Sequence, residues 1–166
     1  MTRSTAPSAR TKVHRLRELA RYDRSTINAI LDEATVCHVG FVDEGQPFVI
    51  PTAIARINDH AYIHGSRVSR MLKLLIAGNP ACITVTLLDG IVVARSAFNS
   101  SMNYRSVVIL GSGEKVTGED KKIALDAFTE HLIPGRTQDI RASKPKELAA
   151  TTAVSYTHLT LPTTVS

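Results

Sequence analysis

Apolar residues change their spacing several times along the chain, and the changes mark the first predicted elements. Positions 27, 30 and 31 follow helical spacing, which predicts a short helix capped by Asp23 or Ser25. The run Val36–Val42 and the longer run Pro47–Ile57 are typical of strands. Because the turn sequence Asp-Glu-Gly-Gln separates them, we expect the two runs to form an antiparallel hairpin.

A third strand and a second helix follow without a long connection. The apolar segment Ala61–Ile63 runs into the sequence His-Gly-Ser, after which apolar residues return at helical spacing. We predict a helix that starts at Arg67 and ends at Ala77, with Gly78 as its C-cap.

The second half of the chain repeats this alternation of strand and helix patterns. The runs Ala81–Leu88 and Ile91–Ala97 flank Asp89-Gly90, a dipeptide typical of tight hairpin turns. A further strand is predicted at Tyr104–Leu110, and a helix at Asp120–Leu132 that Pro-Gly then ends.

These elements together predict a mainly β (α+β) fold. Most neighbouring strands are joined by short turns, which excludes a doubly wound parallel sheet because that fold needs a crossover helix between strands. A small antiparallel split β-barrel with peripheral helices is the economical arrangement, since closure removes exposed sheet edges.

Composition limits the domain count and the compartment. A chain of 166 residues that is 43% hydrophobic and 21% charged fits one domain with one core. No apolar run approaches the roughly 20 residues of a membrane span, and no signal-peptide pattern opens the chain. We therefore expect no membrane partner. Cys37 and Cys82 have no metal-binding spacing, so we expect free thiols and no metal, as is typical of a cytoplasmic protein.

The net charge of +5 belongs to the start of the chain. Residues 1–24 hold seven basic and two acidic side chains, whereas the basic and acidic side chains of the remainder balance. We interpret this segment as a basic leader that is solvated and draped over a partner subunit. Contact with nucleic acid is the less favoured interpretation.

The last twelve residues differ in composition from the rest of the chain. Residues 155–166 are rich in threonine and carry no Lys, Arg, Asp or Glu, and the run Ser-Tyr-Thr-His-Leu-Thr-Leu-Pro-Thr looks like translated sequencing-adapter sequence. We therefore expect a folded domain over residues 25–154 and a non-native tail over 155–166. The domain is then cut short near Val154, just where Thr151–Val154 starts another strand. An authentic threonine-rich tail is the alternative.

The junction after the third strand carries the clearest chemistry. Gly65 lets the backbone approach a ligand closely, Ser66 and Ser69 offer hydroxyls, and Arg67 and Arg70 offer guanidiniums at a helix start. Arginines at that end oppose the helix dipole unless an anion offsets them, which favours a phosphate site. The alternative is that Ser66 is an ordinary N-cap beside solvated arginines.

Six segments in this order make the chain resemble the pyridoxamine 5′-phosphate oxidase-like FMN-binding split-barrel family. The nearest branch is the flavin-nucleotide-binding, 5-nitroimidazole reductase-like one, and the resemblance covers about Val13–Val154. The segments are Cys-His-Val-Gly-Phe (37–41), Pro-Phe-Val-Ile-Pro-Thr (47–52), Tyr-Ile-His-Gly-Ser (62–66), Ser-Arg-Met-Leu (69–72), Thr-Leu-Leu-Asp-Gly (86–90) and Ser-Met-Asn-Tyr-Arg-Ser-Val-Val (101–108).

The resemblance implies a homodimer with FMN at each of two symmetric sites at the subunit interface. Carried over by position, Ile50, Pro51 and Thr52 lie along the edge of the isoalloxazine ring. His64 and Gly65 pass near the ribityl chain or the ring.

The remaining cofactor-binding residues implied by the resemblance contact the phosphate or approach from a later strand. Ser66, Ser69 and Arg70 grip the phosphate, which agrees with the chemistry of the junction. Arg105 and Ser106 reach the flavin, from the other subunit of the dimer if not from their own.

The resemblance implies an FMN-dependent oxidoreductase that reduces a small electron-poor acceptor, such as a nitroaromatic, a quinone or a cofactor-like molecule. NAD(P)H is the expected electron donor. His64 is the candidate catalytic residue, with a structural role in shaping the pocket as the alternative. The alternative function is a non-catalytic flavin- or haem-binding carrier or sensor. Oxidation of pyridoxamine phosphate itself is less favoured, because basic residues for a second phosphate are not evident.

Overall fold

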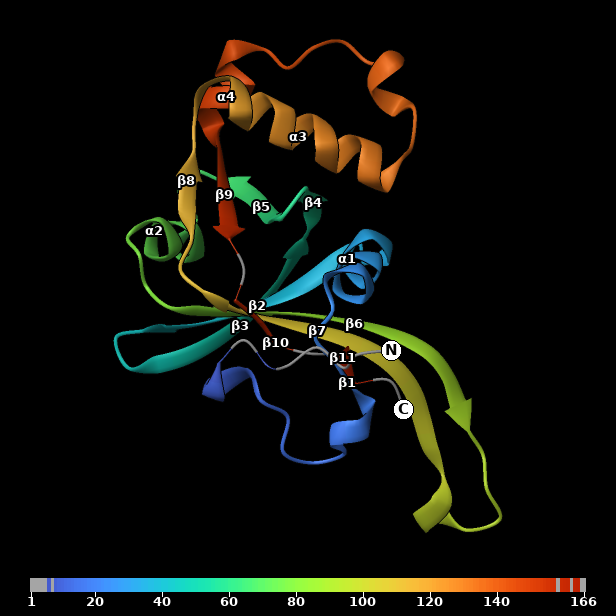
Figure 1. Cartoon of the computed structure of the whole chain (residues 1–166). Helices are drawn as coiled ribbons and strands as arrows, with labels where there is room; N and C mark the ends of the chain where they lie inside the picture. The colour runs from blue at the N-terminus through green and yellow to red at the C-terminus, as the bar shows by residue number, and fades with distance from the viewer. Residues whose placement is uncertain (1–5, 7, 158, 162, 165–166) are drawn as a thin grey trace.

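The structure is a computed structural model that describes residues 6, 8–157, 159–161 and 163–164 (Figure 1). Its strands are β1 (Ala20–Arg21), β2 (Val36–Asp43), β3 (Gln46–Ala53), β4 (Ala55–Ile57), β5 (His60–Ser66), β6 (Ala81–Val92), β7 (Ser101–Gly111), β8 (Glu114–Val116), β9 (Thr151–Thr157), β10 (Leu159–Leu161) and β11 (Thr163–Thr164). Its α-helices are α1 (Arg24–Glu33), α2 (Arg70–Ile76), α3 (Gly118–Leu132) and α4 (Pro145–Ala150). Short 3-10 turns are η1 (Ala9–Thr11), η2 (Arg17–Leu19), η3 (Ala97–Asn99) and η4 (Arg136–Gln138).

Two sheets carry the fold, and every strand pair in the described chain is antiparallel. One sheet has the order β10-β7-β6-β2-β3 and the other has the order β4-β5-β9-β8. A small pair, β1-β11, lies beside them. The mainly antiparallel α+β class is therefore confirmed. The expected closure is wrong, because the hydrogen-bonded orders of the described strands end at open edges instead of forming a ring.

The break between the sheets falls inside a segment that was predicted as one strand. Residues 47–57 divide at Ile54 into β3, which pairs with β2, and β4, which pairs with β5. Ile54 is buried, so the chain bends where its side chain enters the core. The predicted β2–β3 hairpin is confirmed, with Glu44 and Gly45 at positive φ in its turn.

The core lies between the two sheets and is closed by helices. Helix α1 contacts β4 of one sheet and β6 and β7 of the other, and α3 packs on the four-stranded sheet (Figure 1). The largest fully buried side chains are Tyr156, Val39, Ile63, Ile83, Val85, Val107 and Ile109 of the strands, Ile30, Leu31, Leu72 and Leu75 of the helices, and Ile54 between β3 and β4. Cys37 is buried among them, and burial raises the pKa of its thiol to about 12, so this cysteine is unreactive.

Two helix predictions have different outcomes. The Asp23 carboxylate accepts a hydrogen bond of 2.9 Å from the Thr26 amide, which confirms it as the N-cap of α1. The predicted helix start at Arg67 is wrong, because residues 67 and 68 form a separate turn, in which the Ser69 amide donates to the Ser66 carbonyl. Helix α2 begins only at Arg70, with Ser69 as its N-cap.

The hairpin predicted at Asp89-Gly90 is also wrong. Strand β6 runs through both residues and pairs with β7 on either side of a register shift between Leu88 and Gly90. A tight turn of the predicted type needs positive φ, which Gly90 does not adopt. The chain reverses later, at residues 93–100, so that β6 and β7 extend beyond the body of the molecule as a two-stranded ribbon (Figure 1).

The described segments nearest the two ends of the chain contact the five-stranded sheet, η1 through β10 and β11 through β7. Thr11 of the basic leader is buried, and η1 contacts β10. At the other end, the strand predicted to begin near Thr151 is present as β9 and includes the fully buried Tyr156. The boundary predicted at residue 154 stays a prediction, and residues 158, 162 and 165–166 of the predicted tail lie outside the described residues. None of the helices in the described chain combines the length and the apolar character that a membrane crossing needs.

Candidate functional site

The predicted phosphate junction begins in the middle of the four-stranded sheet. His64, Gly65 and Ser66 end strand β5 and pair with Ala153, Thr152 and Thr151 of β9, respectively. A Cβ on Gly65 would lie 3.2 Å from the Cδ1 atom of Leu72. In this structure, therefore, the small residue serves the close packing of α2 on β5.

Arg70 points from the start of α2 toward the β2–β3 hairpin. Its Nη1 atom lies 3.1 Å from Asp43 Oδ2, and its guanidinium carbon lies 4.3 Å from the centroid of the Phe48 ring. The Arg70 side chain remains 58% exposed. An anion could therefore reach the guanidinium, but it would compete with the Asp43 carboxylate. Ser69 is occupied as the helix cap, its Oγ accepting from the Leu72 amide.

The residues predicted to line the flavin ring lie on an edge strand. In the described part of the five-stranded sheet, β3 pairs only with β2, so one side of β3 presents backbone groups that the ladder does not use. Ile50 packs against the core, Pro51 is exposed and Thr52 is half-buried. Pro51 fits such an edge because it has no N–H to donate. This edge can offer hydrogen-bonding groups to a planar ligand.

Arg105 lies elsewhere, at the root of the β6–β7 ribbon. Its guanidinium holds Glu33 of α1 at 2.8 and 2.9 Å and Asp89 of β6 at 2.8 to 3.2 Å. These hydrogen bonds lower the pKa of both carboxyls and raise the pKa of Arg105, the Asp89 contribution being the larger. Ser106 is half-buried opposite Thr86. The contacts of Arg105 thus do not join it to the junction within one chain.

A cavity beside His64 lies between the four-stranded sheet and α3. It has a volume of about 490 Å³ and is lined mainly by α3 and the segment 137–143, with His64 of β5 and Thr151 of β9 completing the wall. The His64 ring meets the Phe128 ring edge-on, with 4.2 Å between centroids. Burial lowers the pKa of His64, so its imidazole is neutral at pH 7. Its Nδ1 atom is buried and has no hydrogen-bond partner among the described residues.

The far wall of this cavity was missed by the sequence analysis. Arg141 lines it and is fixed by two hydrogen bonds, of 2.9 and 2.6 Å, to the Glu147 carboxylate. Residues 137–143 have no periodic apolar pattern, so the sequence gives no signal that they face His64. Phe128 lies in the helix predicted at Asp120–Leu132, and it is buried.

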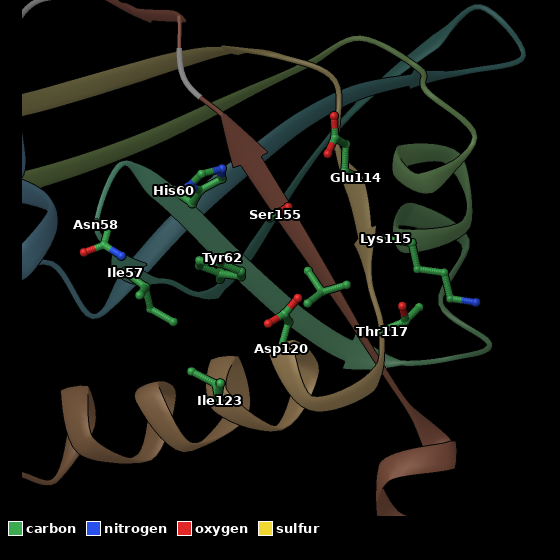
Figure 2. A pocket seen from close by; sticks show the side chains of 11 residues that line it. Ile57, Asn58, His60, Tyr62, Glu114, Lys115, Thr117, Asp120, Ile123 and Ser155 are labelled. Carbon is green, nitrogen blue, oxygen red and sulfur yellow. The ribbon is translucent and has the colours of Figure 1, made fainter.

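Two other hollows lie apart from His64. A polar cleft of about 390 Å³ lies between the four-stranded sheet and the start of α3, with Asp120 of α3 directed toward Tyr62 of β5 (Figure 2). Burial and then the Asp120 carboxylate raise the pKa of Tyr62. A largely apolar groove of about 690 Å³ lies on the outer face of the five-stranded sheet, where Ser8, Arg10 and Thr11 of the leader form one wall.

Open antiparallel sheets around one core, with helices at the periphery, place the molecule in the split-barrel class. The chain belongs to the pyridoxamine 5′-phosphate oxidase family, whose model matches residues 23–162. The family predicted from the six sequence segments is therefore confirmed. A comparison with curated proteins gives no match.

Three solved structures illustrate the similarity. A flavocytochrome, Anf3 from Azotobacter vinelandii, is 42% identical, with 98% of this chain and 76% of that chain covered and a TM-score of 0.89. An FAD- and haem-binding protein from Mycobacterium smegmatis is 39% identical over 89% of this chain and 73% of its own, with a TM-score of 0.84. A protein assigned to 5-nitroimidazole antibiotic resistance in Bacteroides thetaiotaomicron is 26% identical over 84% and 81%, with a TM-score of 0.68.

Proposed function

We propose that this protein binds a flavin and is a flavin-dependent oxidoreductase. The observation that carries the proposal is the similarity, at 39% and 42% identity over most of the chain, to a protein that binds FAD and haem and to a flavocytochrome. FMN is the flavin predicted from the sequence, whereas the Mycobacterium relative binds FAD. Either flavin, once bound, supplies the electron transfer, and the protein supplies binding and orientation.

The residues present fit an anionic, planar cofactor. The exposed guanidinium of Arg70 is the proposed phosphate contact, because arginine binds phosphate through two parallel hydrogen bonds. The open edge of β3 at residues 50–52 is the proposed contact for the polar rim of the ring. In the predicted homodimer with the flavin at the subunit interface, Arg105 and Ser106 belong to the same site only through the second subunit.

For the reaction, we propose reduction of a small electron-poor acceptor with NAD(P)H as donor. The nitroimidazole-resistance relative supports a nitroaromatic as the first acceptor to test. His64 is held neutral by burial and lines the cavity, so its ring is the proposed hydrogen-bonding contact for a ligand there.

The test is an absorbance spectrum of the purified full-length protein, followed by extraction and mass determination of the bound flavin. We expect a yellow protein whose colour is bleached by NAD(P)H and restored catalytically by a nitroaromatic. A colourless protein that neither quenches the fluorescence of added FMN or FAD nor gains heat resistance from them contradicts flavin binding. Bound flavin without turnover favours the carrier function.

Haem binding at His64 is the second candidate function. The neutral imidazole of His64 and the adjoining cavity of about 490 Å³, which has both apolar and polar side chains in its wall, are the features that would hold a haem there. The two haem-containing relatives support the same choice. In this function the protein is an electron carrier or a sensor.

A pair of histidine variants separates haem from flavin binding. We expect His64→Ala to lose the Soret band of the haem-reconstituted protein and to keep its flavin. His60→Ala is the matched control, since His60 lies on the same strand but lines the polar cleft. An unchanged Soret band in His64→Ala rules out His64 as the ligand.

A further inference from the structure

The polar cleft at the start of α3 is a cavity that the proposed function leaves unused (Figure 2). Its volume of about 390 Å³ falls within the roughly 300–1,000 Å³ of small-molecule sites. Aromatic, hydroxyl and carboxylate groups from four elements line it, namely those of His60 and Tyr62 (β5), Ser155 (β9), Glu114 (β8) and Asp120 (α3). The cleft therefore has both the size and the polar groups that a ligand needs.

The register of the four-stranded sheet brings three of these side chains together. Tyr62 pairs with Ser155, and Ser155 pairs in turn with Glu114. Directly paired residues of neighbouring strands point to the same face of a sheet, so a phenol, a hydroxyl and a carboxylate form one row across three strands. Helix α3 places Asp120 over this row, with its side chain directed toward Tyr62 (Figure 2).

The centre of the cleft carries an excess of negative charge. Neither Glu114 nor Asp120 has a salt bridge or a side-chain hydrogen bond within the described part of the chain. Lys115 directs its ammonium group away from Tyr62 and Asp120 (Figure 2). Stabilisation of the helix start accounts for an acidic residue in the first turn of α3, but not for Glu114, which lies on β8. The two carboxylates favour a cationic ligand.

The lining favours an organic cation over a metal ion. Among the residues that the structure describes, no group of three or more His, Cys, Asp or Glu side chains could hold a metal. The rings of His60 and Tyr62 have their centroids 6.2 Å apart, and the face of an aromatic ring attracts an ammonium group. Ile57, Val116 and Ile123 offer apolar contacts for the body of such a ligand.

We propose that this cleft binds a small primary amine in its ammonium form. The ammonium group lies between the Asp120 carboxylate and the Tyr62 ring, and Glu114 supplies the second negative charge. Burial and then the Asp120 carboxylate raise the pKa of Tyr62, so its hydroxyl stays protonated and can donate a hydrogen bond. The cleft shares no lining residue with the His64 cavity, and the proposal does not depend on flavin binding.

The test compares two ligands of the same shape, cyclohexylammonium and the uncharged cyclohexanol. Amide chemical shifts of the full-length protein are followed by NMR as each ligand is added, with and without flavin. We expect saturable shifts at residues 57–62 and 114–123. Cyclohexylammonium should bind about tenfold more tightly than cyclohexanol, as for an exposed ion pair together with a cation–π contact.

A double variant, Glu114→Gln/Asp120→Asn, removes both charges and keeps the shapes of the side chains. Both residues are exposed, so we expect an unchanged circular dichroism spectrum and about tenfold weaker binding of cyclohexylammonium. Asp126→Asn is the matched control, because Asp126 is an exposed carboxylate of the same helix that lines the His64 cavity instead. Its affinity for cyclohexylammonium should equal that of the wild type.

Three results overturn the proposal: equal affinity for the ammonium and the alcohol, shifts confined to residues outside the cleft, and an unchanged affinity in the double variant. A fourth concerns the source of the amine, because a lysine side chain of another protein carries the same group. If Nα-acetyl-lysine N-methylamide binds tenfold or more tightly than cyclohexylammonium, the cleft recognises a protein and not a free amine.

Discussion

Arg70, the proposed phosphate contact, already takes part in an ion pair within the chain. Its guanidinium is shared between the Asp43 carboxylate and the Phe48 ring, and a phosphate must displace the carboxylate. We predict that Arg70→Ala weakens flavin binding by about 1.5–3 kcal/mol, as for a lost charged hydrogen bond. Titration of flavin fluorescence measures the effect.

Asp43→Asn is the complementary variant. It removes the competing charge and keeps the shape of the side chain, so flavin binding should tighten where Arg70→Ala weakens it. If both variants bind flavin like the wild type, Arg70 is not the phosphate contact.

His64 makes stability depend on pH in a defined direction. Its pKa is lowered in the folded state by burial, whereas in the unfolded chain it returns to about 6.5. Between the lowered pKa and about 6.5 the unfolded chain binds the extra proton, so stability falls as pH drops below about 6.5. Urea unfolding at several pH values should show a smaller loss in His64→Gln than in the wild type. An equal loss in both contradicts the burial of a neutral imidazole.

At the scale of elements, the cap of α1 is the clearest case of local sequence deciding structure. Asp23 accepts hydrogen bonds from the Thr26 amide and the Ser25 hydroxyl. Hydrogen bonding by the Thr26 side chain, then by the Thr26 amide and the Ser25 hydroxyl, lowers the pKa of Asp23 to about 2. We predict that Asp23→Ala lowers the free energy of unfolding by about 1 kcal/mol at neutral pH. The effect should fade as pH falls from about 4 toward about 2, because the protonated carboxyl caps poorly.

Ala29→Ser provides the control for this prediction. Ala29 is exposed in the middle of the same helix and does not cap it, so its replacement should cost only the difference in helix propensity, about 0.5 kcal/mol or less, at every pH. Chemical unfolding of the two variants gives the comparison. A loss as large in Ala29→Ser as in Asp23→Ala would mean that helix propensity, not capping, sets the stability of α1.

The elements also show why some local signals failed. Glu44-Gly45 formed the predicted turn because both residues adopt positive φ and the flanking strands pair directly. Asp89-Gly90 has the same kind of composition, yet Asp89 is bound by Arg105 of the facing strand and the strand continues through it. A partner sixteen residues away in sequence decided the outcome, and no local pattern contains it. The bend at Ile54 and the wall at residues 137–143 depend likewise on tertiary packing.

At the scale of the whole molecule, Tyr156 links the end of the four-stranded sheet to the common core. Its side chain is fully buried, and its hydroxyl has no hydrogen-bond partner among the described residues. We predict that Tyr156→Ala lowers the free energy of unfolding by about 3–5 kcal/mol through the cavity that it leaves. Denaturant unfolding with both fluorescence and circular dichroism measures the loss.

Tyr156→Phe separates packing from hydrogen bonding. It keeps the ring and removes an unsatisfied polar group, so stability should stay the same or rise. A large loss in Tyr156→Phe would show that the hydroxyl has a partner outside the described residues. An unchanged Tyr156→Ala would mean that residues beyond 154 add nothing to the fold, as the predicted tail boundary implies.

The position of β9 has a consequence for biosynthesis. Residues 60–66 pair with residues 151–157, so β5 must wait for a strand that leaves the ribosome long after it. Until then, the edge of β5 that pairs with β9 has no partner strand. The nascent polypeptide can aggregate through this edge or be bound there by a chaperone. The four-stranded sheet is therefore expected to form only after residues 151–157 have been synthesised, with the arrival of that segment as the committing step.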